Sequence, residues 1–194
     1  DGVTAQFGAD VLRRQHDKPF FLATGFVRPH LPFIAPRQYF EHYPLDALKL
    51  PPVKADDLAD KPWAARSNAR VEDDIEIRSH EKGRERVIQA YYACVSFVDD
   101  MVGRVVKALD ASPYRDNTIV VFWSDHGWHL GEKRSWRKFT LWEESARTPM
   151  IVVDPRERDS AGKECQRPVA LFDLYPTLAE LCGLSIPDWC DGRS

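Results

Sequence analysis

The sequence has 194 residues, with 27 Lys or Arg against 30 Asp or Glu, so its formal net charge is −3. Its composition, 43% hydrophobic and 29% charged, is that of a globular protein and excludes wholesale disorder or a disulfide-dense miniprotein. The near-zero charge argues against nucleic acid as a partner, and no apolar run approaches the ~20 residues that span a membrane.

The first part of the chain combines one apolar run with long irregular segments. Pro19–Phe26 is short, apolar and rich in aromatic residues, which predicts a buried strand. Val27–Pro44 carries four prolines, a density that predicts a rigid loop rather than a helix or a central strand. Leu45–Ser79 is polar and lacks a sustained period, so we expect a long surface excursion.

The rest of the chain alternates helical and strand patterns. Lys82–Leu109 has apolar residues at spacings of three and four, which predicts an amphipathic helix. Thr118–Trp123 and Pro149–Val153 are apolar without alternation, as in parallel strands buried on both faces. Asp173–Cys182 predicts a second helix, with Gly183 as its stop. This order predicts an α/β domain whose mainly parallel sheet is flanked by helices.

Polar residues follow two of the predicted strands, where open α/β sheets bind their ligands. Asp125 and His126 come directly after Thr118–Trp123, and such a pair suits a divalent metal or a polar reacting group. The alternative is a turn cap and a rim histidine. His30 lies between two prolines, which suits a stiff catalytic loop, although a lone histidine is more often structural. His126 and His129 have zinc-pair spacing, but the glycines around them disfavour the helix that this would need.

A basic segment follows, in which Lys133, Arg134, Arg137 and Lys138 surround Trp136. Such a cluster fits a small anion such as sulfate or phosphate, with Arg134 and Arg137 as substrate-binding residues. The alternative is a solvated loop with extended side chains. The nucleophile motif G-x-S-x-G and the P-loop are both absent. The spacing alone therefore indicates metal and anion chemistry without an attacking group.

Four segments resemble a known family. They are FFLATGFVRPHLPFIAPRQYFEHYP, YYACVSFVDDMVGRVVKALD, TIVVFWSDHGWHLGEKRSWRKFTLWEESARTPMIVV and DLYPTLAELCGL. They occur in the order found in type I sulfatases, with iduronate-2-sulfatase and its bacterial relatives the most similar branch. The resemblance implies an alkaline-phosphatase-like α/β fold and the hydrolysis of sulfate esters. It also implies one Ca²⁺ ion and a formylglycine nucleophile, made from a Cys or Ser in the motif C/S-x-P-x-R.

The resemblance also implies roles for individual residues. Asp125 and His126 fall on the family's metal site, although many members have Asn in place of the histidine. Lys138 falls on the lysine that contacts sulfate. His30 falls on the histidine of P-H-x-P-F, which contacts sulfate or the leaving oxygen. His30 and Lys138 are thus the predicted catalytic residues.

The formylglycine motif C/S-x-P-x-R is not found in this sequence. None of its cysteines, Cys94, Cys165, Cys182 and Cys190, begins a C-x-P-x-R motif. We therefore expect residues 1–194 to be the middle-to-late part of a sulfatase catalytic domain. The N-terminal part with the formylglycine and an Asp-Asp metal pair, and the C-terminal subdomain, would then lie outside it. An isolated chain of this kind is expected to be inactive.

For the parent protein we expect a sulfatase that acts on a sulfated sugar or another small sulfate ester. The alternatives are a phosphatase or phosphodiesterase of the alkaline phosphatase superfamily, or a non-catalytic relative. The resemblance further implies a periplasmic, extracellular or lysosomal location. The sequence leaves the oligomeric state open.

Overall fold

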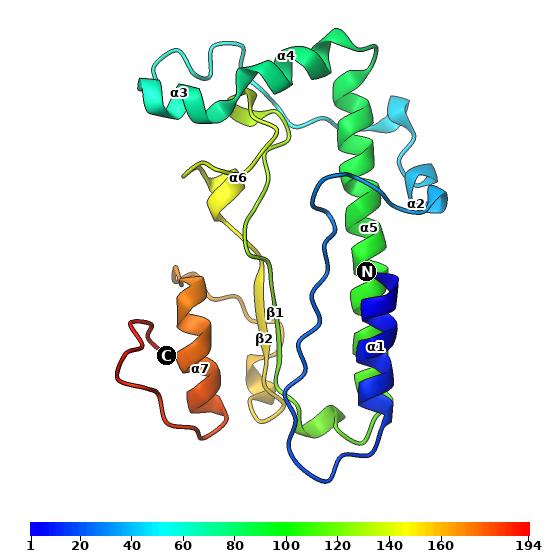
Figure 1. Ribbon diagram of the computed structural model, residues 1–194, viewed down its shortest axis with the longest axis vertical. Coiled ribbons are helices and arrows are strands. Elements are labelled where there is room, and N and C mark those ends of the chain that lie inside the picture. The colour runs from blue at the N-terminus through cyan, green and yellow to red at the C-terminus, as the bar shows by residue number, and fades with distance from the viewer. The chain divides into compact units, whose positions relative to one another are not determined.

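The computed structural model describes all residues from Asp1 to Ser194 (Figure 1). They form two compact units, Asp1–Pro155 and Arg156–Ser194. Every site residue named from the sequence lies in the first unit. None of the helices has both the length and the apolar character that a membrane crossing requires.

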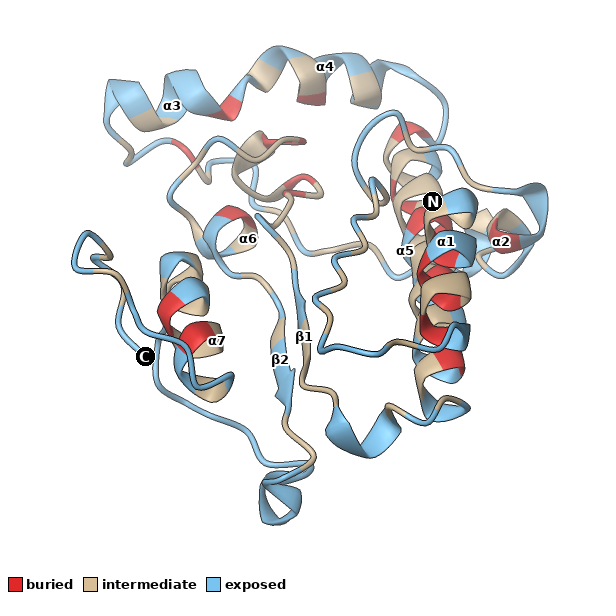
Figure 2. Cartoon of the chain, turned by 60° about the horizontal axis from the view of Figure 1, so that its bottom comes forward, coloured by how far each residue is buried: buried red, intermediate tan, exposed pale blue.

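Two helices build the core of the first unit. α5 (Gly83–Asp110) confirms the predicted long helix, and α1 (Gly2–Arg13), which was not predicted, packs along it. Ala9 and Leu12 of α1 contact Ala108 of α5, and buried residues gather along this interface (Figure 2). Small side chains on both helices let the backbones approach closely.

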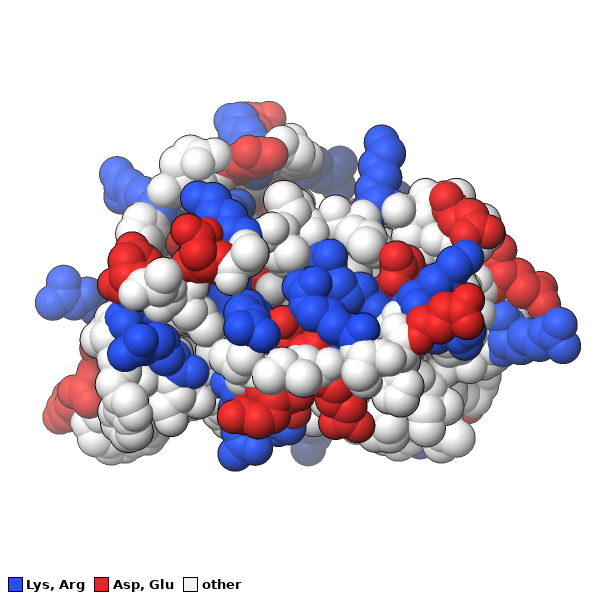
Figure 3. Space-filling model, turned by 90° about the horizontal axis from the view of Figure 1, so that it is seen from above, with Lys and Arg blue, Asp and Glu red and all other residues white.

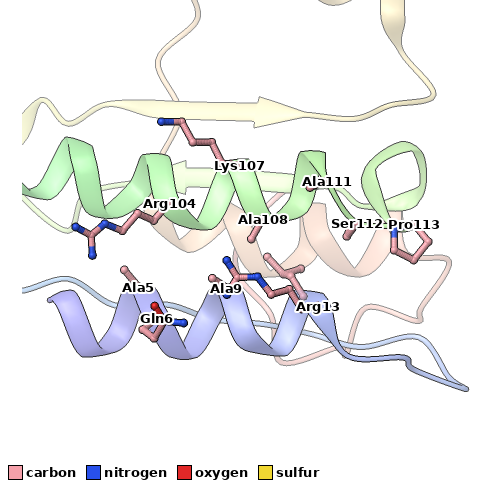
Figure 4. Close-up of a pocket in the computed structure, with 11 residues that line it drawn as sticks. Ala5, Gln6, Ala9, Arg13, Arg104, Lys107, Ala108, Ala111, Ser112 and Pro113 are labelled. Carbon is pink, nitrogen blue, oxygen red and sulfur yellow. The ribbon is translucent and has the colours of Figure 1, made fainter.

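A cavity of about 500 Å³ lies between the same two helices (Figure 4). Alanine side chains of α1 and α5 line it, together with Arg13, Arg104 and Lys107. None of the site residues named from the sequence contributes to its lining. The residues named from the sequence therefore lie elsewhere in this unit.

Short helices interrupt the segments predicted to be irregular, so that prediction was partly wrong. α2 (Arg37–Glu41) lies in the proline-rich loop, and α3 (Trp63–Ala69) and α4 (Val71–Ser79) lie in the long excursion. α2 and α3 each begin directly after a proline, Pro36 and Pro62. A proline is compatible with the start of a helix because the first amides need no intrahelical partner.

The sheet corrects the prediction of mainly parallel strands. β1 (Val120–Trp123) and β2 (Met150–Val153) form a two-stranded antiparallel ribbon in which Trp123 lies opposite Met150. The apolar pattern located both strands but carries no information on direction. The prediction that both faces are buried was also wrong, since Trp123 is 46% exposed. In a two-stranded ribbon each strand is an edge, which leaves one row of its backbone N–H and C=O groups without a strand partner.

The predicted strand Pro19–Phe26 is extended but joins no ladder. Its apolar character serves packing instead, because Phe20 and Leu22 contact the α1–α5 core. Phe20 also lies edge-on to Tyr114, with ring centroids 5.3 Å apart. The prediction of a buried strand was thus wrong, because no residue of this segment is fully buried and Phe21 is 84% exposed.

α6 (Glu143–Ala146) lies between β1 and β2 along the chain. The second unit holds the predicted C-terminal helix, α7 (Leu174–Leu181). Gly183 ends α7 as predicted, with a φ of +69° and a hydrogen bond from the next amide, Leu184, to the carbonyl of Ala179. Cys182, which follows α7, is a free and exposed cysteine.

Candidate active site

Three side chains that are far apart in the sequence meet in the first unit. Nζ of Lys138 lies 2.7 Å from Nε2 of His30 and 2.8 Å from Nε2 of His126. The two imidazole centroids are 6.0 Å apart. The structure thus brings both predicted catalytic residues and one predicted metal ligand to one point, which spacing alone did not show.

The second nitrogen of each ring indicates its tautomer. Nδ1 of His30 lies 2.8 Å from the carbonyl oxygen of Leu31, and Nδ1 of His126 lies 2.8 Å from that of Gly127. A carbonyl oxygen only accepts, so each Nδ1 carries the hydrogen and each neutral ring presents an unprotonated Nε2. Lys138 donates to both of these nitrogens. Each Nε2 can therefore take up a proton or bind a cation.

The loop that carries His30 is held by hydrogen bonds at both ends. The guanidinium of Arg28 donates to the carbonyls of His30 and Ile34, at 2.9 and 2.8 Å. The carboxylate of Asp1 accepts hydrogen bonds from the amides of Val27 and Arg28, at 2.8 and 3.1 Å. These bonds restrict the loop and so limit the positions that the imidazole can adopt.

His126 owes its position to the glycine that follows it. The amide of Gly127 donates to the carbonyl of Ser145 at 2.8 Å. A Cβ at Gly127 would lie 2.1 Å from the carbonyl oxygen of Glu144, closer than any real contact. Only glycine allows the chain after β1 to approach α6 this closely.

Aromatic rings pack on one side of the cluster. Trp128 lies 5.6 Å from the ring of His30, and Nζ of Lys138 lies 5.8 Å from the Trp128 ring centroid. Phe33 connects Trp128 to Tyr91 of α5, with centroid distances of 5.9 and 5.6 Å. Burial raises the pKa of Tyr91, as expected for a phenol in apolar surroundings. Trp128 thus joins the ammonium to a row of packed aromatic rings.

The other basic residues of the segment have a different environment. Each pairs with a carboxylate: Lys133 with Asp57, Arg134 with Asp74 and Arg137 with Asp73. Basic and acidic side chains accordingly interleave on the face over α3 and α4 (Figure 3). The partners of Lys138 are two imidazoles instead. The substrate-binding role of Arg134 and Arg137 stays a prediction, and their guanidinium groups already bind carboxylates of α4.

The acidic partners on α4 were missed from the sequence. Hydrogen bonds from Arg137 hold the pKa of Asp73 below its ordinary value. Burial would raise the pKa of Asp74, but hydrogen bonds from Trp136, Arg134 and Arg78 together outweigh it and leave that pKa lowered. The cluster of basic residues Lys133–Lys138 is the sequence feature that could have pointed to these carboxylates, because cations that become buried need carboxylate partners.

His129 does not join the cluster. Its ring is fully buried, with Nε2 2.8 Å from Oγ1 of Thr140. Burial lowers the pKa of His129, which favours the neutral ring. His126 and His129 thus make contact with different partners, and nothing in their geometry favours a shared zinc ion.

Comparison with known proteins identifies the family. The sequence model of the family described as Sulfatase matches residues 1–184. The chain belongs to the sulfatase family.

Individual relatives agree with this assignment. A sulfatase of Formosa agariphila is 43% identical over 173 residues, which cover 88% of this chain and 34% of the relative. Iduronate 2-sulfatase of Mus musculus is 32% identical over 208 residues, covering 89% of this chain and 37% of the relative. The sulfatase chain described here thus spans about a third of the length of these relatives.

A solved structure extends the likeness to the fold. The phosphonate monoester hydrolase SpPMH from Silicibacter pomeroyi matches with a TM-score of 0.77 and 28% identity, covering 92% of this chain and 37% of that one. The chain therefore forms part of the alkaline-phosphatase-like fold expected for a sulfatase.

The metal ligands implied by the family can be compared with the geometry. The Asp125 side chain is 82% exposed, and its Oδ2 lies 3.5 Å from Nε2 of His126. These two residues offer a carboxylate and an imidazole, whereas Ca²⁺ takes six to eight ligands, mostly oxygens. No group of three or more metal-binding side chains occurs in the structure. Asp125 and His126 therefore fit part of a calcium site and do not form a complete one.

Proposed function

We propose that this sulfatase chain supplies the anion-binding half of an active site that hydrolyses sulfate esters. The observation that carries the proposal is the ammonium of Lys138, held between the Nε2 atoms of His30 and His126. An ammonium with three donors, aromatic walls and neutral hydrogen-bond partners suits a tetrahedral oxyanion, which would take over those hydrogen bonds.

The residues have separate roles in this proposal. Lys138 binds non-bridging oxygens of the sulfate group and offsets the negative charge that they carry. His30 takes up a proton at Nε2 and delivers it to the bridging oxygen as the sulfur–oxygen bond breaks. Trp128 packs beside His30 and the Lys138 ammonium. The alcohol then leaves neutral.

Asp125 and His126 are proposed as ligands that this chain contributes to a Ca²⁺ ion. When bound, the ion would supply positive charge to the sulfate oxygens. A formylglycine, which the family resemblance implies, would supply the nucleophile. Because the chain covers about a third of its relatives, both groups are assigned to the complete protein.

A sulfated sugar is the proposed substrate class. The similarity to iduronate 2-sulfatase supports it, because that enzyme's name specifies a sulfated sugar acid. The location outside the cytoplasm stays a prediction from the resemblance.

Hydrolysis of a phosphorus ester is the second candidate. It is favoured by the match to a phosphonate monoester hydrolase over 92% of the chain. Sulfate and phosphonate esters are both tetrahedral oxyanions, so the same lysine and histidines suit either.

The test uses the whole protein, expressed at the length that its gene encodes. Turnover of para-nitrophenyl sulfate should fall by roughly 100-fold or more in Lys138→Ala and in His30→Ala, because each loses a group that acts on the transition state. Lys82→Ala, which removes a lysine paired with Asp46 at 2.6 Å, is the matched control and should keep its rate. Rates near wild type in the two site variants would contradict the assigned roles. Faster turnover of a para-nitrophenyl phosphonate than of the sulfate would favour the second candidate.

A further inference from the structure

The residue before Lys138 is tied to α4. Nη2 of Arg137 donates to Oδ1 of Asp73 at 3.1 Å, and Nε of Arg137 donates to Oδ2 of the same carboxylate. This two-point pairing restrains both the distance and the orientation of the guanidinium. The chain direction into Lys138 is therefore restrained from α4.

The next residue of α4, Asp74, forms hydrogen bonds to the same segment, the residues just before Lys138. Its side chain is fully buried and accepts hydrogen bonds from Nε1 of Trp136 and Nε of Arg134, both at 3.1 Å. Nε of Arg78, one turn along α4, donates to it at 2.8 Å. Two consecutive carboxylates of one short helix thus bind three of the residues that precede Lys138.

Backbone hydrogen bonds also join the two ends of the loop 129–137. The amide of His129 donates to the carbonyl of Arg137 at 3.0 Å, and the amide of Gly131 donates to that of Ser135 at 2.9 Å. Gly131 has a φ of +108° and its missing Cβ leaves room for the ring of Trp136. A loop closed in this way moves as a unit, so a restraint at Arg137 is transmitted to Lys138.

We propose that Asp73 is a positioning residue that sets the place of the Lys138 ammonium through Arg137. The inference rests on the proposed function, in which Lys138 binds the sulfate oxygens. Asp73 touches no substrate itself. Its effect on anion binding should therefore require Lys138, and this dependence separates positioning from a general contribution to folding.

The test is a double-mutant cycle on the whole protein, read as the dissociation constant for inorganic sulfate by calorimetry. Asp73→Ala should weaken sulfate binding about tenfold when Lys138 is present, and less than about twofold in a Lys138→Ala background. Asp73→Glu keeps a carboxylate and should recover most of the affinity. Asp46→Ala breaks an exposed ion pair with Lys82 and serves as the control, with unchanged affinity.

Equal losses in both backgrounds, no loss in either, or no sulfate binding by the wild-type protein would each overturn the positioning role. Unfolding in urea, measured alongside, separates lost stability from lost affinity, because destabilisation alone would act in both backgrounds. Turnover of para-nitrophenyl sulfate is assayed separately. If the mutant cycle gives the expected affinities but the protein does not turn over the ester, the positioning role of Asp73 stands and the sulfatase activity is rejected. If the protein turns over the ester but the effects of the two mutations are additive, the sulfatase activity stands and the positioning role is rejected.

Discussion

Lys138 stands at the centre of the candidate site, where its ammonium contacts two imidazoles. Its identity, and those of His30 and His126, were named from the sequence as candidates for one site. Their convergence within 2.8 Å required the fold, because the histidines lie in separate loops. The two carbonyls that fix the imidazole tautomers, those of Leu31 and Gly127, have no sequence signal at all.

The role of Asp125 leads to a separate prediction. If its carboxylate binds Ca²⁺ in the complete protein, Asp125→Ala should raise the calcium concentration needed for half-maximal turnover by roughly tenfold or more. The measurement is activity against free Ca²⁺ after chelation. Asp99→Ala, a change at an exposed carboxylate of α5, is the control. A superimposable calcium titration in the Asp125 variant would remove this residue from the metal site.

At the scale of elements, the strength of the periodic signal decided what could be predicted. α5 was predicted nearly to its ends because its apolar stripe runs through many turns. α4 was missed because Val71–Ser79 is short and has no apolar face that repeats. Tertiary ion pairs join it to Arg134 and Arg137, and a local sequence pattern does not contain such contacts.

Two glycines provide a matched test of the local packing. Gly127→Ala should destabilise the protein by about 2 kcal/mol or more, since its Cβ would collide with the carbonyl of Glu144. Gly103→Ala, in the middle of α5 with no atom within 4 Å of the new Cβ, should stabilise it by up to about 1 kcal/mol. Urea unfolding measures both. Equal changes in the two variants would refute the close approach at Gly127.

The pair of Asp57 and Lys133 predicts a pH dependence. The hydrogen bond from Lys133, 2.6 Å long, is the main cause that lowers the pKa of Asp57 from its ordinary 3.8. A lowered folded-state pKa means that the pair stabilises the fold above about pH 4 and that this stability is lost as the pH falls through the folded value.

Asp57→Asn should therefore be less stable than wild type at pH 7, by roughly 1 kcal/mol. The difference should shrink as the pH is lowered from about 5 to about 2, because the wild-type carboxylate becomes protonated there. Thermal unfolding across this pH range measures the difference in stability between the variant and the wild type. A difference that stays constant with pH would show that the ion pair is not its source.

At the scale of the whole molecule, the sequence predicted the family and the α/β character but not the sheet. The apolar runs of β1 and β2 were placed correctly, yet their antiparallel pairing and exposure were not. Trp123 and Val153 are each about half exposed, at 46% and 52%. An apolar run indicates that a segment can form a strand. How exposed its side chains are depends on which other elements cover the strand, and the run itself does not show this.

The point between His30, His126 and Lys138 is proposed to bind a tetrahedral oxyanion. The most direct test is a crystal structure of the whole protein soaked in selenate, a sulfate analogue whose selenium is located by anomalous scattering. Selenate oxygens are expected within hydrogen-bond distance of Nζ of Lys138, with the present lysine–histidine contacts replaced. Selenate bound elsewhere, or its absence from this point at concentrations that inhibit the enzyme, would contradict it.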